Sequence, residues 1–263
     1  MTIAGSDSCG GAGIQADLKT FAAHGVYGTS AVTAVTAQNT EAVAGVQTMS
    51  PDFVALQIDA VVEDTAIDAA KTGILATSDV IAVVANKFEE HRIERAVVDP
   101  IMVDKSGARL LEPSAIETLK KQLIPRAYIV TPNLPEAAAL VGFSVDDEDA
   151  VKGACRQIVE MGAKAVVIKG GRGTGEEAID WLYDGRRFSR FAAPRINHRS
   201  THGTGCTFSA AIAAQLARGA QLEAAVRSAK RYLTAALELG VAIGRGSGRI
   251  DHFVGETVWP RRS

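Results

Sequence analysis

Short runs of almost purely apolar residues alternate along this chain with longer amphipathic segments, and this alternation limits the fold more than any other feature. The short runs lack the polar alternation of a strand with one exposed face, so helices should cover both faces of their sheet. Strands that are separated by helices pair in parallel through right-handed crossovers. The sequence therefore predicts an α/β protein with a mostly parallel sheet. The expected strands are Thr2–Gly5, Thr29–Ala37, Ala66–Thr72, Arg95–Asp99, Tyr128–Thr131 and Ala165–Lys169.

One segment departs from this pattern. Asp184-Gly185 separates two β-like runs between Trp181 and Phe188, and Asp-Gly favours a tight hairpin turn. We expect this antiparallel hairpin near one edge of the sheet. No linker or repeat divides the sequence, so residues 1–263 should form a single domain. The expected helices are Ala12–His24, Pro51–Val62, Ser78–Glu90, Pro113–Leu123, Leu134–Val141, Asp147–Met161, Cys206–Arg218 and Leu222–Leu239.

The composition excludes several classes of protein. With 263 residues, 47% hydrophobic and 22% charged, the chain can form a stable hydrophobic core without disulfides or structural metal ions. Its net charge of −2 offers no basic surplus for nucleic acid, and charges interrupt every apolar run before it could span a bilayer. Three scattered cysteines make neither a disulfide framework nor a metal knuckle, which favours a reducing cytoplasm. Residues 1–5 show no signal-peptide pattern, and a strand that starts beside Met1 is compatible with a longer natural N-terminus.

Polar or glycine-rich clusters follow five of the expected strands. In an open parallel sheet, ligands bind beyond the carboxyl ends of the strands. Five such clusters carry more weight than any one of them alone, and they predict a binding site at that edge. The clusters are Gly5-Ser-Asp7, Gln38-Asn39, Asp99-Pro100, Thr131-Pro-Asn133 and Lys169-Gly-Gly171.

The segment from His202 to Thr207 places two glycines before a helix of small residues. Successive amides at such a helix start form a cradle for an anion, helped by the helix dipole. Cys206 would lie at the helix N-terminus, where the pKa of a thiol should fall. A flexible turn with a buried structural cysteine explains the same segment equally well.

Two further segments suit a small ligand. Gly10–Gly13 lets a ligand approach the backbone, although a plain tight turn is the simpler reading. Its spacing does not fit the dinucleotide fingerprint, and the chain contains no P-loop motif. The Gln38 amide can pair with a ring nitrogen and a neighbouring amino group together, or can simply cap the end of its strand.

Three charged residues suit a phosphate site. Asp99 and Glu136 are candidates to hold Mg²⁺ directly or through water, because hard carboxylate oxygens suit Mg²⁺ beside phosphates. Each is also an ordinary loop or helix-start carboxylate. Lys169 can neutralise a phosphate as a point charge, or can be an exposed lysine at a strand end.

Together these segments resemble the ribokinase superfamily, and more narrowly the hydroxymethylpyrimidine/phosphomethylpyrimidine kinases of thiamine biosynthesis. The resemblance runs from Thr2 to about Phe253, and its combination of motifs is highly specific. It is carried by Ile3–Asp7, Gly10–Thr20, Ala37–Thr40, Lys71–Gly73, Asp99–Val103, Lys105–Gly107, Thr131–Glu136, Lys169–Gly171 and Thr201–Cys206.

The resemblance implies a ribokinase-like three-layer α/β/α sandwich and a homodimer. It also implies an ATP- and Mg²⁺-dependent kinase that phosphorylates 4-amino-5-hydroxymethyl-2-methylpyrimidine and then converts the monophosphate to the diphosphate. Cys206 would act as a thiolate base, with Gly203, Thr204 and Gly205 forming the anion hole. The residues implied for the pyrimidine are Gln38, Ala12, Asp17, Gly11, Ile74 and Ile101. Those implied for ATP and Mg²⁺ are Asp99, Asn133, Glu136, Lys169 and Thr204.

Three positions depart from the pattern of the family. Cys9, Ile74 and Asp104 stand where serine, methionine and alanine are usual, and the first two would alter the pocket shape slightly. None of the three touches the expected transfer machinery.

Two alternatives to the pyrimidine kinase stay open. Pyridoxal kinase is close, because vitamin B6 also carries a hydroxymethyl arm on a nitrogen ring, although Cys206 and Gln38 favour the pyrimidine. From another class, His202 and Cys206 suggest a Cys–His hydrolase. A hydrolase would leave the five strand-end clusters without a function. A non-catalytic nucleotide-binding module would do the same.

Overall fold

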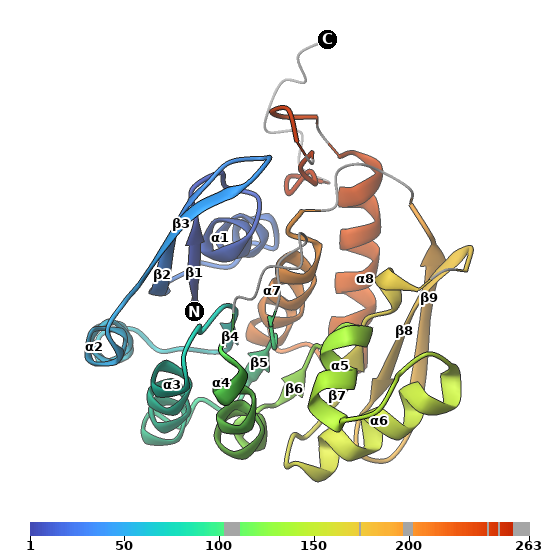
Figure 1. Cartoon of the computed structure of the whole chain (residues 1–263), viewed down its shortest axis with the longest axis horizontal. Coiled ribbons are helices and arrows are strands. Elements are labelled where there is room, and N and C mark those ends of the chain that lie inside the picture. Colours follow the sequence, from blue (N-terminus) through green and yellow to red (C-terminus); the bar gives the residue numbers. More distant parts are fainter. Residues whose placement is uncertain (103–110, 174, 197–201, 241, 247, 255–263) are drawn as a thin grey trace.

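The computed structural model describes residues 1–102, 111–173, 175–196, 202–240, 242–246 and 248–254 (Figure 1). Within these residues, one nine-stranded sheet has the order β3-β2-β1-β4-β5-β6-β7-β8-β9. The strands are β1 (Thr2–Asp7), β2 (Ser30–Gln38), β3 (Val43–Thr48), β4 (Ala70–Thr72), β5 (Ala96–Val98), β6 (Ile129–Val130), β7 (Val166–Ile168), β8 (Glu177–Tyr183) and β9 (Phe188–Pro194).

The helices alternate with the strands as the sequence predicts, with small shifts at their ends. Pro113–Thr118 is followed by a π turn, Leu119–Leu123, and a 3₁₀ turn, Ile124–Arg126. A further 3₁₀ turn spans Gly170–Arg172. The α-helices are α1 (Gly13–Ala23), α2 (Pro51–Val62), α3 (Ser78–Glu90), α4 (Pro113–Thr118), α5 (Leu134–Val141), α6 (Glu148–Glu160), α7 (Thr204–Ala217) and α8 (Leu222–Glu238).

The strand pairing confirms the predicted sheet. From β2 through β1, β4, β5 and β6 to β7, every neighbouring pair is parallel. β8 and β9 form the expected antiparallel hairpin beside β7, with Tyr183 paired to Phe188 across the Asp184-Gly185 turn. The central strands contain only two or three residues, so β4 begins four positions later than the expected Ala66.

The opposite edge of the sheet was not predicted. β3 pairs antiparallel with β2 and is exposed along most of its length. Because a strand without a buried face needs no regular apolar pattern, the sequence of Val43–Thr48 carried no strand signal. As a result, both edges of the sheet are antiparallel rather than one.

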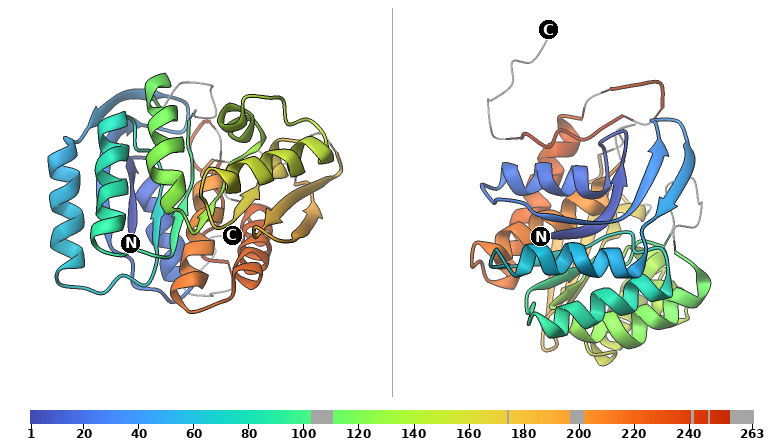
Figure 2. Two further views of the ribbon diagram at one scale, coloured as in Figure 1. Left: turned by 90° about the horizontal axis from the view of Figure 1, so that it is seen from below. Right: turned by 90° about the vertical axis from the view of Figure 1, so that its left-hand side faces the viewer.

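Two hydrophobic cores confirm the three layers (Figures 1 and 2). Val97 of β5 packs in the core beneath α1, α7 and α8, whereas its neighbour Val98 packs in the core of the opposite face. Alternate residues of a strand point to opposite faces, which is why these strands are apolar throughout. α7 is buried along nearly its whole length, and its many alanines suit this central place. Within the described residues, no helix has the length and apolarity needed to cross a membrane.

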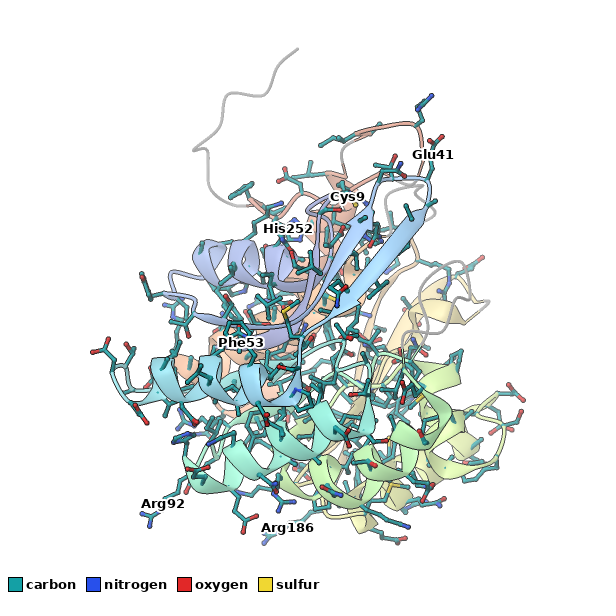
Figure 3. The ribbon with its side chains drawn as sticks, turned by 60° about the vertical axis from the view of Figure 1, so that its left-hand side comes forward. Cys9, Glu41, Phe53, Arg92, Arg186 and His252 are labelled. Atoms are coloured by element: carbon teal, nitrogen blue, oxygen red, sulfur yellow. The ribbon has the colours of Figure 1, made fainter. Side chains whose placement is uncertain are left out.

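The C-terminal segment returns to the start of α7. Thr207 Oγ1 lies 3.1 Å from His252 Nε2, and the Tyr232 hydroxyl donates to the His252 carbonyl at 2.6 Å. Figure 3 shows His252 near the end of the molecule that also carries Cys9. Burial, aided by Lys19 and Arg249, lowers the pKa of His252 to about 4. The imidazole is therefore neutral in the folded protein at neutral pH.

This histidine should make the protein less stable in acid. The unfolded chain binds a proton near pH 6.5, whereas the folded protein does so only near 4, so stability falls as the pH drops through this window. The expected loss at about pH 5 is roughly 2 kcal/mol relative to about pH 8. His252→Gln removes the titrating group, so its urea unfolding free energy should fall correspondingly less between these two pH values. An identical pH dependence in wild type and variant would contradict this assignment.

Candidate active site

A cavity of about 520 Å³ opens beyond the carboxyl ends of the parallel strands. Each of the five strand-end clusters contributes to its wall, because parallel strands deliver their loops to one edge. The structure brings most of the expected site residues together here. Those that line the cavity are Ala12, Gln38, Ile74, Asp99, Ile101, Asn133, Glu136, Lys169, Gly203, Thr204, Gly205 and Cys206. Asp104, Lys105–Gly107 and Thr201 lie outside the described residues.

The loop before α7 is held in a conformation that requires glycine. Gly203 has a φ of +83°, and a Cβ on it would lie 1.8 Å from the carbonyl oxygen of Gly11. Only a glycine fits both the left-handed backbone and this close contact. Gly203 then caps α7 without a side-chain hydrogen bond, and Thr207 N–H donates to its carbonyl at 2.9 Å. The helix start therefore presents backbone amides and a positive dipole end to the cavity, as an anion site requires.

Cys206 lies in the first turn of α7 but is not the low-pKa thiol that the sequence predicted. Burial raises the pKa of Cys206 to about 11, even though the Lys71 ammonium and the Gly13 amide favour the thiolate. Asp17 and Asp99 add to the rise. The expectation of a resting thiolate was therefore wrong, because desolvation outweighs the helix start.

Asp17 and Gly11 lie behind the cavity wall rather than on it. Asp17 is fully buried, and both of its carboxylate oxygens accept from Lys71 Nζ at 2.9 Å. Thr2 Oγ1 also donates to Asp17, at 2.6 Å. The implied contact of Asp17 with the pyrimidine is thus contradicted by its burial. Gly11 instead accommodates Gly203, while its own amide donates to Asp7 at 3.1 Å.

Lys71 is the cation beneath Cys206. Burial opposes its charge, but Asp17, Cys206 and Asp99 outweigh that effect and raise the pKa of Lys71. Nothing in the sequence pattern pointed to a chemical role for Lys71. A fully buried lysine paired with a buried carboxylate is a feature that only the tertiary structure reveals.

Asp99 and Lys169 form a second ion pair in the cavity wall. Lys169 Nζ donates to Asp99 at 2.8 Å, and the hydroxyls of Thr131 and Ser209 donate to the same carboxylate at 3.0 and 3.1 Å. Burial opposes the Lys169 charge, but Asp99 and then Glu136 raise the pKa of Lys169. A Cβ on Gly205 would lie 3.4 Å from Lys169 Nζ, so a protonated amine stands beside the glycine loop.

Asn133 and Glu136 begin α5 with a reciprocal capping box. Asn133 Oδ1 accepts from the Glu136 amide at 3.0 Å, and Glu136 accepts from the Asn133 amide at 2.8 Å. The box fixes the buried Glu136 carboxylate in the cavity wall. Hard oxygens of Glu136 and Asp99 beside one lysine suit Mg²⁺. Asp99 already accepts from three protein donors, so it fits contact through water better than direct coordination.

In the same cavity wall, Gln38 lies beside an unpredicted partner. His202 Nε2 lies 3.5 Å from Gln38 Nε2 and 2.9 Å from Asp7 Oδ2. A carboxylate only accepts, so the imidazole N–H donates to Asp7. Burial opposes the Asp7 charge, but the bonds from His202 and Cys9 lower the pKa of Asp7. His202 is thus engaged with Asp7 rather than paired with Cys206.

The part of the cavity wall that β8 and α8 form was not predicted from the sequence. Lys230 of α8 donates to Asp180 of β8 at 2.8 Å, and both line the cavity. Asp180 also accepts from the Gly170 amide at 2.9 Å, which anchors the turn after β7. The sequence signal that could have revealed this ion pair is a single charged residue on the apolar face of β8 and another on that of α8. Leu233, Thr234 and Leu237 complete this wall.

Comparison with known proteins gives one family. The family described as phosphomethylpyrimidine kinase matches residues 7–251. The hydroxymethylpyrimidine/phosphomethylpyrimidine kinase of Bacillus subtilis is 49% identical over 254 residues, covering 96% of this chain and 94% of that protein. The thiamine biosynthesis bifunctional protein ThiED of Geobacter sulfurreducens is also 49% identical, over 97% of this chain, which spans 52% of that longer protein.

Two solved structures share the fold. The ADP complex of Bacillus subtilis pyridoxal kinase superposes with a TM-score of 0.89 at 39% identity, over 95% of this chain and 96% of that one. Phosphomethylpyrimidine kinase from Clostridium difficile gives 0.81 at 43% identity, over 90% of this chain and 97% of that one. These matches extend over the loops that build the cavity. The chain therefore belongs to the phosphomethylpyrimidine kinase family.

Proposed function

We propose that this protein transfers the terminal phosphoryl group of ATP to the hydroxymethyl arm of 4-amino-5-hydroxymethyl-2-methylpyrimidine, and then phosphorylates the monophosphate. One observation carries the assignment. A single cavity is lined both by Gln38, whose amide can pair with a ring, and by the glycine loop and Lys169. A kinase needs both features, because phosphoryl transfer depends mainly on positioning and charge neutralisation.

The chain's own groups divide this work between them. The amides of residues 203–206 would hold the charge that develops on the moving phosphoryl group. Lys169, kept protonated by Asp99 and Glu136, would add a fixed positive charge beside that loop. Glu136 would hold Mg²⁺ directly, and Asp99 would hold it through water. The ion would neutralise the negative charge of the phosphate oxygens.

Cys206 would take the proton of the attacking alcohol. At rest its thiol is protonated, since its pKa is about 11. Lys71 favours the thiolate from behind, which makes a transient deprotonation less costly. The monophosphate needs no such base, because its second pKa lies near 6 and it is mostly a dianion at neutral pH.

Pyridoxal kinase stays the second candidate. Its support is the close match to the Bacillus subtilis pyridoxal kinase structure. A Cys–His hydrolase is disfavoured, because Asp7 holds His202 and the Cys206 thiol has a raised pKa. A homodimer and a cytoplasmic location stay predictions.

An ATP-consumption assay separates these candidates. The purified protein receives Mg²⁺-ATP with the pyrimidine alcohol, its monophosphate, pyridoxal or a simple ester. Turnover of both pyrimidine substrates supports the proposal. Turnover of pyridoxal alone, or ester hydrolysis without ATP, would replace it by the corresponding alternative.

Gln38→Leu should weaken binding of the pyrimidine and spare binding of ATP. The ring would lose its paired donor and acceptor, while the glycine loop and Lys169 stay intact. We expect at least a tenfold rise in the Kd of the pyrimidine, about 1.4 kcal/mol, by calorimetry. Unchanged affinity for the pyrimidine in the leucine variant would remove Gln38 from the site.

Cys206→Ala should slow phosphorylation of the alcohol more than that of the monophosphate. A positioned base contributes about 10²–10⁴-fold to the first step, whereas the dianion needs none. The anion loop should survive, because it consists of backbone amides.

The pH dependence provides a second readout of the same residue. A base whose pKa is about 11 is about tenfold more deprotonated for each pH unit gained below that value. Single-turnover rates on the alcohol should therefore rise between about pH 7 and 9 in the wild type and stay flatter in Cys206→Ala. Equal losses on both substrates, or parallel pH profiles, would show that Cys206 is not the base.

A further inference from the structure

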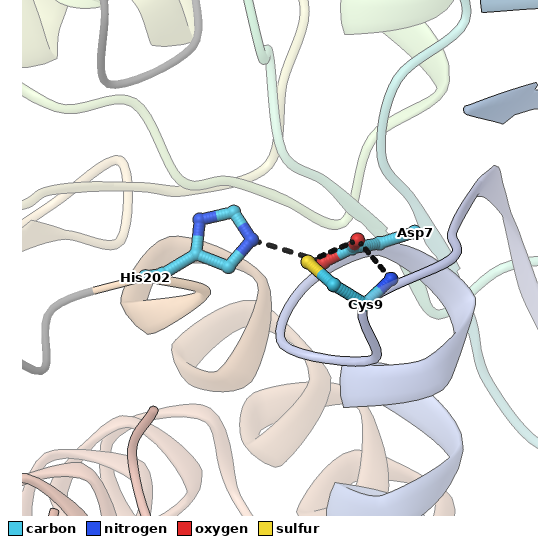
Figure 4. A group of neighbouring side chains, drawn as sticks. All are labelled: Asp7, Cys9 and His202. Carbon is cyan, nitrogen blue, oxygen red and sulfur yellow. Dashed lines mark hydrogen bonds and ion pairs between the residues drawn. The ribbon is translucent and has the colours of Figure 1, made fainter. Parts of the chain in front are cut away.

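Three side chains of different chemistry converge beside Gln38, at the wall of the cavity. Asp7 ends β1, Cys9 follows in the next turn, and His202 comes from the segment before α7. One ligand atom from each lies within 4.8 Å of the others. Figure 4 shows these side chains directed toward one another, with dashed lines joining Asp7 to Cys9 and to His202.

The carboxylate at the centre is fixed in advance. The backbone amides of Cys9, Gly11 and Ala12 donate to Asp7 at 2.9, 3.1 and 2.8 Å. Two side-chain donors complete its shell, because Cys9 Sγ lies 2.9 Å from Oδ1 and His202 Nε2 lies 2.9 Å from Oδ2. A single cation that replaced these two hydrogens would keep all three side chains near their present positions.

We propose that Asp7, Cys9 and His202 form a binding site for a thiophilic divalent cation such as Zn²⁺. Thiolate, imidazole and carboxylate are the three ligand types that Zn²⁺ takes in proteins, and this set does not suit Mg²⁺. Cys9 binds as the thiolate and releases its proton to solvent, while His202 binds through Nε2 as the neutral tautomer that carries its proton on Nδ1.

The surroundings orient the ligands and place two of them at the cavity wall. Arg249 donates to Cys9 Sγ and is itself buried, so it orients the sulfur from the second shell. Asp7 and His202 both line the cavity. Three protein ligands at the wall of a cavity leave Zn²⁺ a fourth position for water, as in accessible zinc sites.

A cation at this position would occupy space beside Gln38, whose amide lies 3.5 Å from His202 Nε2. It would then compete with the pyrimidine. This consequence depends on the proposed function, whereas binding of the cation does not.

The test measures binding of ZnCl₂ by calorimetry in the absence of nucleotide, and the absorption of the Co²⁺-loaded protein. Cys9→Ser keeps a hydroxyl near Asp7 but removes the soft ligand, and Cys155→Ser on α6 is the matched control because Cys155 is buried away from the cavity. We expect one Zn²⁺ per chain, at least tenfold weaker binding in Cys9→Ser, and unchanged binding in Cys155→Ser. The thiolate-to-Co²⁺ charge-transfer band should disappear only in Cys9→Ser.

His202→Gln is a second variant and should also weaken Zn²⁺ binding at least tenfold. Equal affinity and an equal Co²⁺ band in wild type and Cys9→Ser would overturn the proposal. Loss of the band in a Cys206→Ser variant instead would place the cation on the wrong thiol and would overturn it as well. These readouts stand even if the pyrimidine turns out not to be the substrate.

Discussion

The contact between two backbone segments, Gly203 and Gly11, determines where everything else in the cavity can lie. The carbonyl of Gly11 occupies the space that any side chain on residue 203 would need. This contact joins the turn after β1 to the start of α7, two segments about 190 positions apart in the sequence. It brings the turn after β1, the amide loop and Cys206 into one wall. Because both partners are backbone, the geometry does not depend on a flexible side chain.

Beneath this wall lies a row of alternating charges. Asp17 pairs with Lys71, and Asp99 pairs with Lys169. Burying single charges would be prohibitive, but each here has an opposite partner and further hydrogen bonds. Cys206 lies within the field of both pairs, which explains why its pKa reflects a contest between desolvation, Lys71 and two carboxylates. A site for a highly charged substrate thus consists of charges that are already neutralised in pairs.

The sequence predicted the features that follow from local pattern. Apolar strands, helices between them, the Asp184-Gly185 hairpin and glycine before α7 all follow from local rules, and the structure has them. The sequence could not predict β3, because Val43–Thr48 has no buried face and therefore no periodic pattern of apolar residues. It could not predict the pKa of Cys206, because a helix start lowers the pKa of a thiol but the packing around it decides the outcome.

The same reasoning explains the errors within the site. A polar residue near a glycine turn looks like a ligand contact, yet Asp17 faces inward to Lys71, a partner 54 positions away. Asp180 and Lys230 were missed for the opposite reason. Each is a single charge on an otherwise apolar face. Its burial is explained only by the ion pair with the other residue, 50 positions away in the sequence. In a single sequence, a lone charge on an apolar face indicates a buried ion pair but does not identify its distant partner.

The most direct test of this account compares two glycine variants at opposite ends of α7. Gly203→Ala and Gly219→Ala introduce the same methyl group at nearly the same φ, +83° and +84°. A Cβ at Gly219 would meet nothing within 4 Å, whereas at Gly203 it would collide with Gly11. Both variants bear the left-handed strain of roughly 1–2 kcal/mol, so the difference between them isolates the loop contact.

The measurement is turnover of the pyrimidine alcohol with Mg²⁺-ATP, on variants whose far-UV circular dichroism matches that of the wild type. We expect near-wild-type turnover for Gly219→Ala and a loss of about 10²-fold or more for Gly203→Ala, because the amide loop can no longer take its position. Equal turnover in two folded variants would contradict this expectation.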